Sequence, residues 1–349
     1  MMSPRRLPAL GACWASAYSW EGLELELGAA PSVLKNPYNK TRTFKIHALR
    51  IALATSCTSS FAAAPFCLLA LTSMLRLRPA VRRLATKRIN LNADLAEGYG
   101  PWRLTDDAAL MDIVTTANVA CGGHAGDAAA MARACALAAT KGVSVGAHPG
   151  YDDKPGFGRR AVPLSMEEVE ELVTVQLGAL RGISRLAWAR HGAGVEVTHV
   201  KPHGALNNVA CVDSNVAAAI CRAIRAVDAS LIVLAPAGSE LLRAAEDFAL
   251  PRAAEVFADR GYLSDGTLAP RHLDGALIVD AAEAARNAVR LASGEPVRAL
   301  DTGADVVLQA DSVCVHGDKP SAVAQARAVR DALVDAGFEL APLPEIVCI

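Results

Sequence analysis

The sequence predicts an α/β protein whose parallel strands close into a (β/α) barrel, either regular or irregular and seven-stranded. Three observations support this fold class. From Arg88 onward, short apolar runs typical of strands alternate with alanine-rich helical stretches. Seven or eight such units occur, and none carries the G-x-G-x-x-G turn of dinucleotide-binding doubly wound sheets. Residues 89–349 contain no internal repeat or dividing linker, so we expect them to form one domain.

Seven runs of mostly apolar residues are the expected strands. In chain order they are residues 88–94, 113–121, 143–148, 195–201, 231–235, 254–259 and 313–318. Stretches with helical periodicity follow them. They include residues 128–140, 166–188, 215–227, 240–249, 281–291 and 322–336. Strands that alternate with helices of this length form right-handed parallel βαβ units, which leaves a barrel or a doubly wound sheet as the architecture.

The first 88 residues are a different kind of sequence. They hold 13 Lys and Arg against three acidic residues, so we expect an extension that is disordered, a targeting peptide or a gene-model artefact. Residues 51–75 are uncharged and long enough to span a bilayer, but Pro65 and several polar residues dilute the run, so no stable membrane association is expected. We expect a cytoplasmic protein, or a mitochondrial one if the arginine-rich residues 74–88 are a transit peptide.

The composition argues against several functional classes. The net charge is −1 and aromatic residues make up 5% of the chain, so neither nucleic-acid binding nor a sugar-stacking groove is favoured. The nine cysteines form no C-x-x-C pair, which argues against zinc ribbons and disulfide scaffolds. The chain also lacks the G-x-x-x-x-G-K-S/T phosphate loop and the G-x-S-x-G nucleophile elbow.

Polar side chains gather at the carboxyl ends of the expected strands, where parallel α/β folds place their active sites. Single residues have structural explanations: a histidine beside glycine can bond a loop backbone, Asp94 can cap a helix, and Arg159-Arg160 can be surface charge. These explanations do not account for so many ionisable groups at one rim, because buried charges are costly unless they are paired or used.

We expect catalytic roles for Asp94, His124, His148, Lys201 and His203. Asp94, His124 and His148 could bind a divalent metal ion that activates water. Without a metal, one His or Asp could act as general base and another as general acid. Lys201 could hold a substrate carboxylate or a developing oxyanion. The expected substrate-binding residues are Asn92, Glu97, Asp127, Arg260, Asp311 and His316.

Six segments of the chain, taken in order, resemble the motifs of the LamB/YcsF family. They are LNADLAEGYG (91–100), ANVACGGHAGD (117–127), GAHPGYDDKPGFGRR (146–160), HVKPHGALNN (199–208), FADRGY (257–262) and ADSVCVHGD (310–318). The resemblance runs from about Ile89 to about Gly337 and leaves the basic extension outside.

This resemblance implies a barrel similar to that of glycoside hydrolases and carbohydrate deacetylases. Members of the family are known as the A-type subunits of 5-oxoprolinase. The implied activity is therefore hydrolysis of a cyclic amide, the ATP-dependent opening of 5-oxo-L-proline to L-glutamate with ADP and phosphate. ATP is the implied co-substrate, accompanied by Mg²⁺, and the implied partners are the B- and C-type subunits of 5-oxoprolinase.

Three positions depart from the usual family pattern. Ala96 stands in place of Gly, and we expect strain if the turn there needs a positive φ. Gly123 stands in place of Phe, which we expect to enlarge the pocket beside His124, and Asn207 stands in place of Tyr. Two alternatives therefore stay open: a metal-dependent, deacetylase-like hydrolase of another amide, and a non-catalytic lactam-binding protein.

Overall fold

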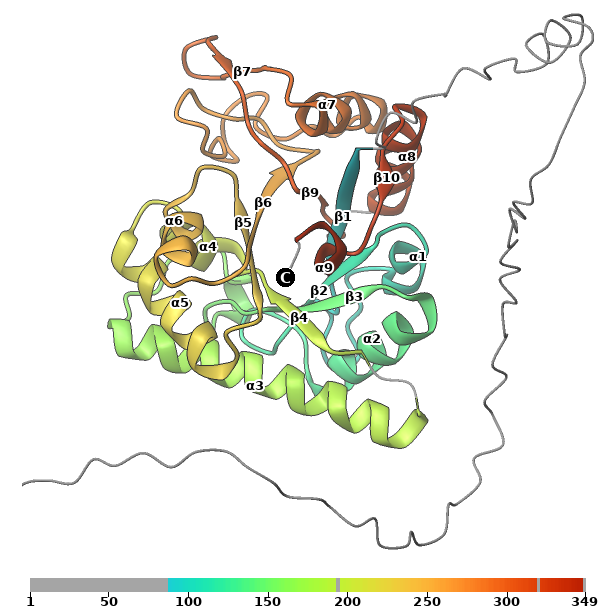
Figure 1. Cartoon of the computed structure of the whole chain (residues 1–349), viewed down its shortest axis with the longest axis vertical. Helices are drawn as coiled ribbons and strands as arrows, with labels where there is room; N and C mark the ends of the chain where they lie inside the picture. The colour runs from blue at the N-terminus through green and yellow to red at the C-terminus, as the bar shows by residue number, and fades with distance from the viewer. Residues whose placement is uncertain (1–86, 193–194, 319–320, 348–349) are drawn as a thin grey trace, which may run out of the picture. The chain divides into compact units, whose positions relative to one another are not determined.

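The computed structural model describes residues 87–349 apart from 193–194, 319–320 and 348–349, so nearly all of the basic extension lies outside the described residues. Within the described ranges, seven parallel strands pair side by side and close into a barrel, because the last strand bonds to both the sixth and the first (Figure 1). The expected fold class is thus confirmed in its irregular, seven-stranded form. In barrel order the strands are β1 (Arg88–Leu95), β2 (Thr116–Ala120), β3 (Ser144–His148), β4 (Val197–Val200), β5 (Ile232–Pro236), β6 (Arg252–Phe257) and β9 (Ser312–Val315).

Helices surround the barrel, and the longer ones match the expected stretches within a few residues (Figure 1). They are α2 (Ala128–Lys141), α3 (Met166–His191), α5 (Ser214–Val227), α6 (Glu240–Asp247), α7 (Ala281–Ser293) and α8 (Ala322–Asp335). Their ends follow local chemistry: Ser165 and Glu168 form a reciprocal capping box at the start of α3, and Gly192 ends it with a φ of 64°. In this part of the chain, no helix combines the length and the apolar character needed to cross a membrane.

Several short elements were not expected from the sequence. They are α1 (Asp107–Met111), the 3₁₀ turn Lys154–Gly156, α4 (Gly204–Ala210), the hairpin of β7 (Val297–Arg298) and β8 (Asp305–Val306), β10 (Glu339–Leu340) and α9 (Leu343–Ile346). The expected strand 113–121 begins only at Thr116. Ile113 and Val114 donate their backbone N–H groups to the carbonyl of Leu110, so they form the turn that follows α1.

The amino-terminal end of the barrel is covered by the carboxyl-terminal segment. Leu343 is fully buried and packs with Ile232, Leu234 and Ala253. Its backbone N–H donates to the hydroxyl of Thr116 at 3.1 Å. These contacts cover the barrel at the end where the strands begin.

Polar side chains fill part of the barrel interior and bond to one another. The amide of Asn118 donates to the side-chain oxygen of Asn92 at 2.7 Å. Its own oxygen accepts from Nε2 of His199 at 2.9 Å. Gly146 makes room for the His199 ring, because a Cβ at this position would lie 2.2 Å from it. A bonded polar layer of this kind gives the site above it a rigid floor.

Candidate active site

A cavity of about 500 Å³ opens at the carboxyl ends of the strands. The sequence-predicted residues that line it are Asp94, Glu97, His148, Lys201, His203, Arg260 and His316. Asn92 and His124 are fully buried just beneath this lining. Residues from the ends of five strands or the loops after them therefore meet in one pocket, as expected for a parallel barrel.

Lys201 is held at the centre of a buried charge network. Its ammonium lies 2.9 Å from a carboxylate oxygen of Asp94 and 2.9 Å from one of Glu255, and it also contacts Asn92 and the sulfur of Cys314. Burial opposes the charge, but the two carboxylates keep the pKa of Lys201 well above its ordinary value. The cation is thus fixed by protein partners, which limits its freedom to reach a substrate.

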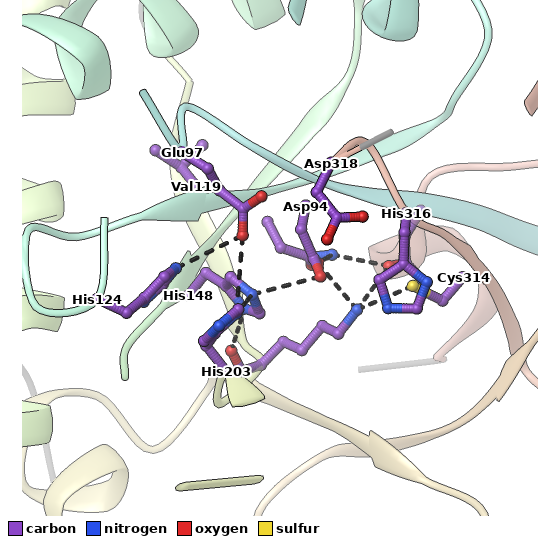
Figure 2. A network of polar contacts seen from close by, with 12 residues as sticks. Asp94, Glu97, Val119, His124, His148, His203, Cys314, His316 and Asp318 are labelled. Atoms are coloured by element: carbon purple, nitrogen blue, oxygen red, sulfur yellow. Dashed lines mark hydrogen bonds and ion pairs between the residues drawn. The ribbon is translucent and has the colours of Figure 1, made fainter. Parts of the chain in front are cut away.

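Asp94 connects this network to the histidines. Burial would raise its pKa, but the nearby His148 and Lys201 hold the pKa well below the usual range. One carboxylate oxygen accepts from Lys201 and from Asn118, and the other lies 3.4 Å from Nε2 of His148. Asp94 is therefore an ionised group with one oxygen facing the histidine cluster (Figure 2).

Three histidines and Glu97 form a compact, buried cluster at the floor of the pocket (Figure 2). The rings of His124 and His203 stack with their centroids 3.6 Å apart, and His148 meets His203 edge-on at 4.8 Å. Burial lowers the pKa of His203 to about 3, with repulsion from His148 adding to the effect. Gly158 permits the close stacking, because a Cβ there would lie 2.6 Å from the Cβ of His124.

Two groups among the described residues have the spacing needed to hold a metal ion. In each group the ligand atoms all lie within 4.8 Å of one another. The first group is Glu97, His124, His148 and His203, and the second is Asp94, Cys314 and His316. The expected ligands Asp94, His124 and His148 are thus divided between the two groups.

Arginines line the outer part of the pocket. Arg260 is buried and donates to the carbonyl oxygens of Ala269 and Ala276. Its pKa is lowered by burial and by the positive charge of Arg271, and the pKa of Arg271 is lowered by burial and by Arg159. Three like charges at one wall repel one another, so this wall favours an anionic ligand.

Besides the buried Asn92, two expected substrate-binding residues lie outside the pocket lining. Asp127 caps α2, accepting from the N–H groups of Ala130 at 2.7 Å and Gly100 at 2.7 Å. Asp311 precedes β9 and accepts from the backbone N–H of Ala254 at 2.8 Å, so it lies at the amino-terminal end of the barrel. Their carboxylates bond to backbone in the structure, and neither is brought to the other site residues.

Three polar residues near the site were not predicted from the sequence, namely Glu255, Arg271 and Asp318. Glu255 is a buried carboxylate followed by the apolar residues 256–258 of an expected strand, which was the signal available in the sequence. Arg271 and Asp318 line the pocket from loops, and Asp318 accepts from Arg159 at 2.6 Å. No periodicity marks such loop positions.

Two of the three departures from the family pattern have clear structural settings. Ala96 has a φ of 58°, so the turn does require the left-handed conformation and the alanine is strained. The expected enlargement of the pocket at Gly123 is wrong. A Cβ at Gly123 would lie 2.6 Å from the carbonyl oxygen of Gly150 and 2.7 Å from the amide oxygen of Gln176, so Gln176 occupies this space.

The comparisons with known proteins agree with one another. The model of the LamB/YcsF family matches residues 89–348. A protein of Rhodopseudomonas palustris strain BisB18, named as the A-type subunit of 5-oxoprolinase, is 50% identical over 255 residues, which are 73% of this chain and 97% of the relative. Another of that name from Nitrobacter winogradskyi is 49% identical over 73% of this chain and 97% of its own length. The crystal structure of a lactam utilization protein from Thermus thermophilus is 42% identical, with a TM-score of 0.67 over 73% of this chain and 99% of that one.

Proposed function

The chain belongs to the LamB/YcsF family, and from this membership we propose that it is the A-type subunit of a 5-oxoprolinase. It would open 5-oxo-L-proline to L-glutamate, coupled to hydrolysis of ATP to ADP and phosphate. The observation that carries the proposal is the pocket itself, in which an arginine wall faces a floor of carboxylates and imidazoles. Such a pocket suits a small cyclic amide that carries a carboxylate.

The proposed reaction has three steps and consumes one ATP and two water molecules. Transfer of the terminal phosphoryl group of ATP to the amide oxygen releases ADP and makes the ring carbon a better electrophile. One water adds to that carbon, and the ring nitrogen leaves with a proton as the free amine. A second water cleaves the resulting acyl phosphate, which gives the new carboxylate of glutamate and inorganic phosphate.

We assign roles to the pocket residues from where they lie. Arg260 and Arg271 would hold the substrate carboxylate through charge-assisted hydrogen bonds. Asp94 would accept a proton from the attacking water, because its carboxylate lines the pocket and is held by Lys201. His316, which is bonded to Asp259 at 2.8 Å, would protonate the leaving nitrogen.

We propose that ATP, accompanied by Mg²⁺, is handled partly by partner subunits of the B and C types. The sequence lacks the phosphate-binding loop that would mark a nucleotide site of its own. The curated relatives carry the name of one lettered subunit of 5-oxoprolinase, which supports an assembly of several different chains.

A coupled assay tests the proposal. The full chain is mixed with B- and C-type subunits, ATP and 5-oxoproline, and glutamate and ADP are followed while each component is omitted in turn. Asp94→Asn, His124→Ala and His203→Ala should each abolish turnover, whereas Asp112→Asn at the exposed end of α1 should not. As a control, the B- and C-type subunits are first shown to be active with a different A-type chain. The proposal is refuted if the folded chain then gives no glutamate with these subunits.

A second function is favoured by the histidine cluster, namely metal-dependent hydrolysis of another amide. It is distinguished by activity that needs zinc or manganese but not ATP. Tight lactam binding without turnover, even with the partners present, would instead indicate a non-catalytic binding protein.

A further inference from the structure

We propose that Glu97, His124, His148 and His203 bind one divalent transition-metal ion of the zinc class at the floor of the pocket. The inference deepens the proposed function by naming a cofactor of the same site. It rests on that function only for the role of the ion, because binding is measured without substrate, ATP or partner subunits.

Backbone carbonyls determine which ring nitrogens carry protons. Nδ1 of His148 lies 2.7 Å from the carbonyl oxygen of Lys201, and Nε2 of His203 lies 2.9 Å from that of Phe157. A carbonyl oxygen can only accept, so these two ring nitrogens are N–H donors. The remaining nitrogens, Nε2 of His148 and Nδ1 of His203, are then the ones that can offer a lone pair to an ion.

These two nitrogens face each other at 2.9 Å. A proton shared between these two nitrogens can be replaced by a metal cation, because each nitrogen then offers its lone pair to the ion. The pattern is also typical of metal-ligating histidines, which donate their second ring nitrogen to a carbonyl or carboxylate and thereby direct the first one at the ion.

His124 and Glu97 complete the ligand set. His124 is fully buried, and neither of its ring nitrogens has a hydrogen-bond partner among the described residues. Its Nε2 lies 3.6 Å from a carboxylate oxygen of Glu97, and the same oxygen lies 3.7 Å from Nδ1 of His203 (Figure 2). An unsatisfied buried imidazole beside a carboxylate is costly unless a ligand binds both.

The second group, Asp94, Cys314 and His316, does not fit an ion equally well. Asp94 and Cys314 both contact the ammonium of Lys201, which already supplies a positive charge, and His316 is bonded to Asp259. In the first group, no ligand atom lies within hydrogen-bond distance of a lysine or arginine nitrogen among the contacts of the described residues.

The donor atoms indicate the class of metal. Three imidazoles and one carboxylate suit zinc and similar first-row ions, whereas Mg²⁺ prefers oxygen ligands and retained water. Such an ion supplies Lewis-acid polarisation of an amide carbonyl. Glu97, His148 and His203 line the cavity, so the substrate would meet this end of the site.

The test is metal binding by the full chain after removal of metals with a chelator. Zn²⁺ is titrated by calorimetry, and the bound metal is counted by mass spectrometry. We expect about one ion per chain, and Co²⁺ should give visible absorption bands as an independent signature. Glu97→Gln and His203→Gln should weaken zinc binding by more than the roughly tenfold to hundredfold loss caused by removing a supporting hydrogen bond.

His316→Gln is the matched control, because it lies in the same pocket but in the other group, and it should bind zinc as the parent does. Circular dichroism checks that each variant folds, and zinc should raise the melting temperature of the parent and of His316→Gln only. The inference is overturned if the parent chain binds no zinc. It is also overturned if zinc binding survives both Glu97→Gln and His203→Gln, or if only His316→Gln loses it. If zinc binds as expected but the coupled assay gives no glutamate, the proposed function falls and the metal site stands.

Discussion

Replacement of Lys201 by Met should destabilise the fold strongly. The methionine side chain has a similar length, so the change removes the charge and the hydrogen bonds more than it removes volume. Asp94 and Glu255, whose side chains are 9% and 0% exposed, would lose the cation that lies 2.9 Å from each of them. Breaking a buried ion pair by removing one partner costs about 3–5 kcal/mol, because the other partner stays buried and uncompensated.

Urea denaturation of the full chain measures this loss in the free energy of unfolding. The melting temperature should fall by roughly 6–20 °C, at about 2–4 °C per kcal/mol. Lys141→Met is the matched control, since Lys141 pairs with Asp112 at the surface, where such contacts contribute less than about 1 kcal/mol. Glu255→Gln in the Lys201→Met background should restore part of the stability by removing one uncompensated carboxylate. The reasoning is refuted if Lys201→Met is as stable as the Lys141→Met control, or if the second substitution lowers stability further.

Three further predictions concern stability and are measured by the same denaturation experiment. Ala96→Gly should stabilise the fold by about 1 kcal/mol, because the φ of 58° strains an alanine; an unchanged midpoint would contradict this. Gly146→Ala should destabilise it by about 1–3 kcal/mol or more, since the new Cβ would lie 2.2 Å from the His199 ring. Asp127→Ala should cost about 1 kcal/mol through loss of the α2 cap while zinc binding is retained; impaired zinc binding would instead link Asp127 to the pocket.

The barrel could be predicted because the residue pattern of its strands and long helices agrees with their burial in the fold. The run 143–148 is apolar and short, and all but the first residue of β3 is buried, as a strand covered on both faces should be. The hairpin of β7 and β8 has two residues in each strand, and β10 also has two. Elements this short are held by tertiary contacts, so no periodicity in the sequence reveals them.

The position of the site at the carboxyl ends of the strands could be predicted from the parallel fold. The hydrogen bonds and ion pairs between its residues could not. Histidines beside glycine or proline at strand ends do meet at the pocket, because parallel strands finish on one side of the barrel. Asp127 and Asp311 share the residue type of the site carboxylates, yet they bond backbone N–H groups elsewhere. Whether an aspartate caps a helix or faces a pocket depends on how far the fold places it from the other site residues. A single sequence does not contain these distances between residues.

The site separates into two halves that differ in how their charge is balanced. In one half, the ammonium of Lys201 neutralises Asp94 and Glu255 within the protein. In the other half, Glu97 and three imidazoles bring their ligand atoms within 4.8 Å of one another, and it is this half that we propose a metal ion balances. Asp94 belongs to the balanced half but directs one oxygen at His148, 3.4 Å away. The ammonium of Lys201 lowers the pKa of Asp94, so under the proposed function it holds Asp94 in the ionised form that can accept a proton while making it a weaker base.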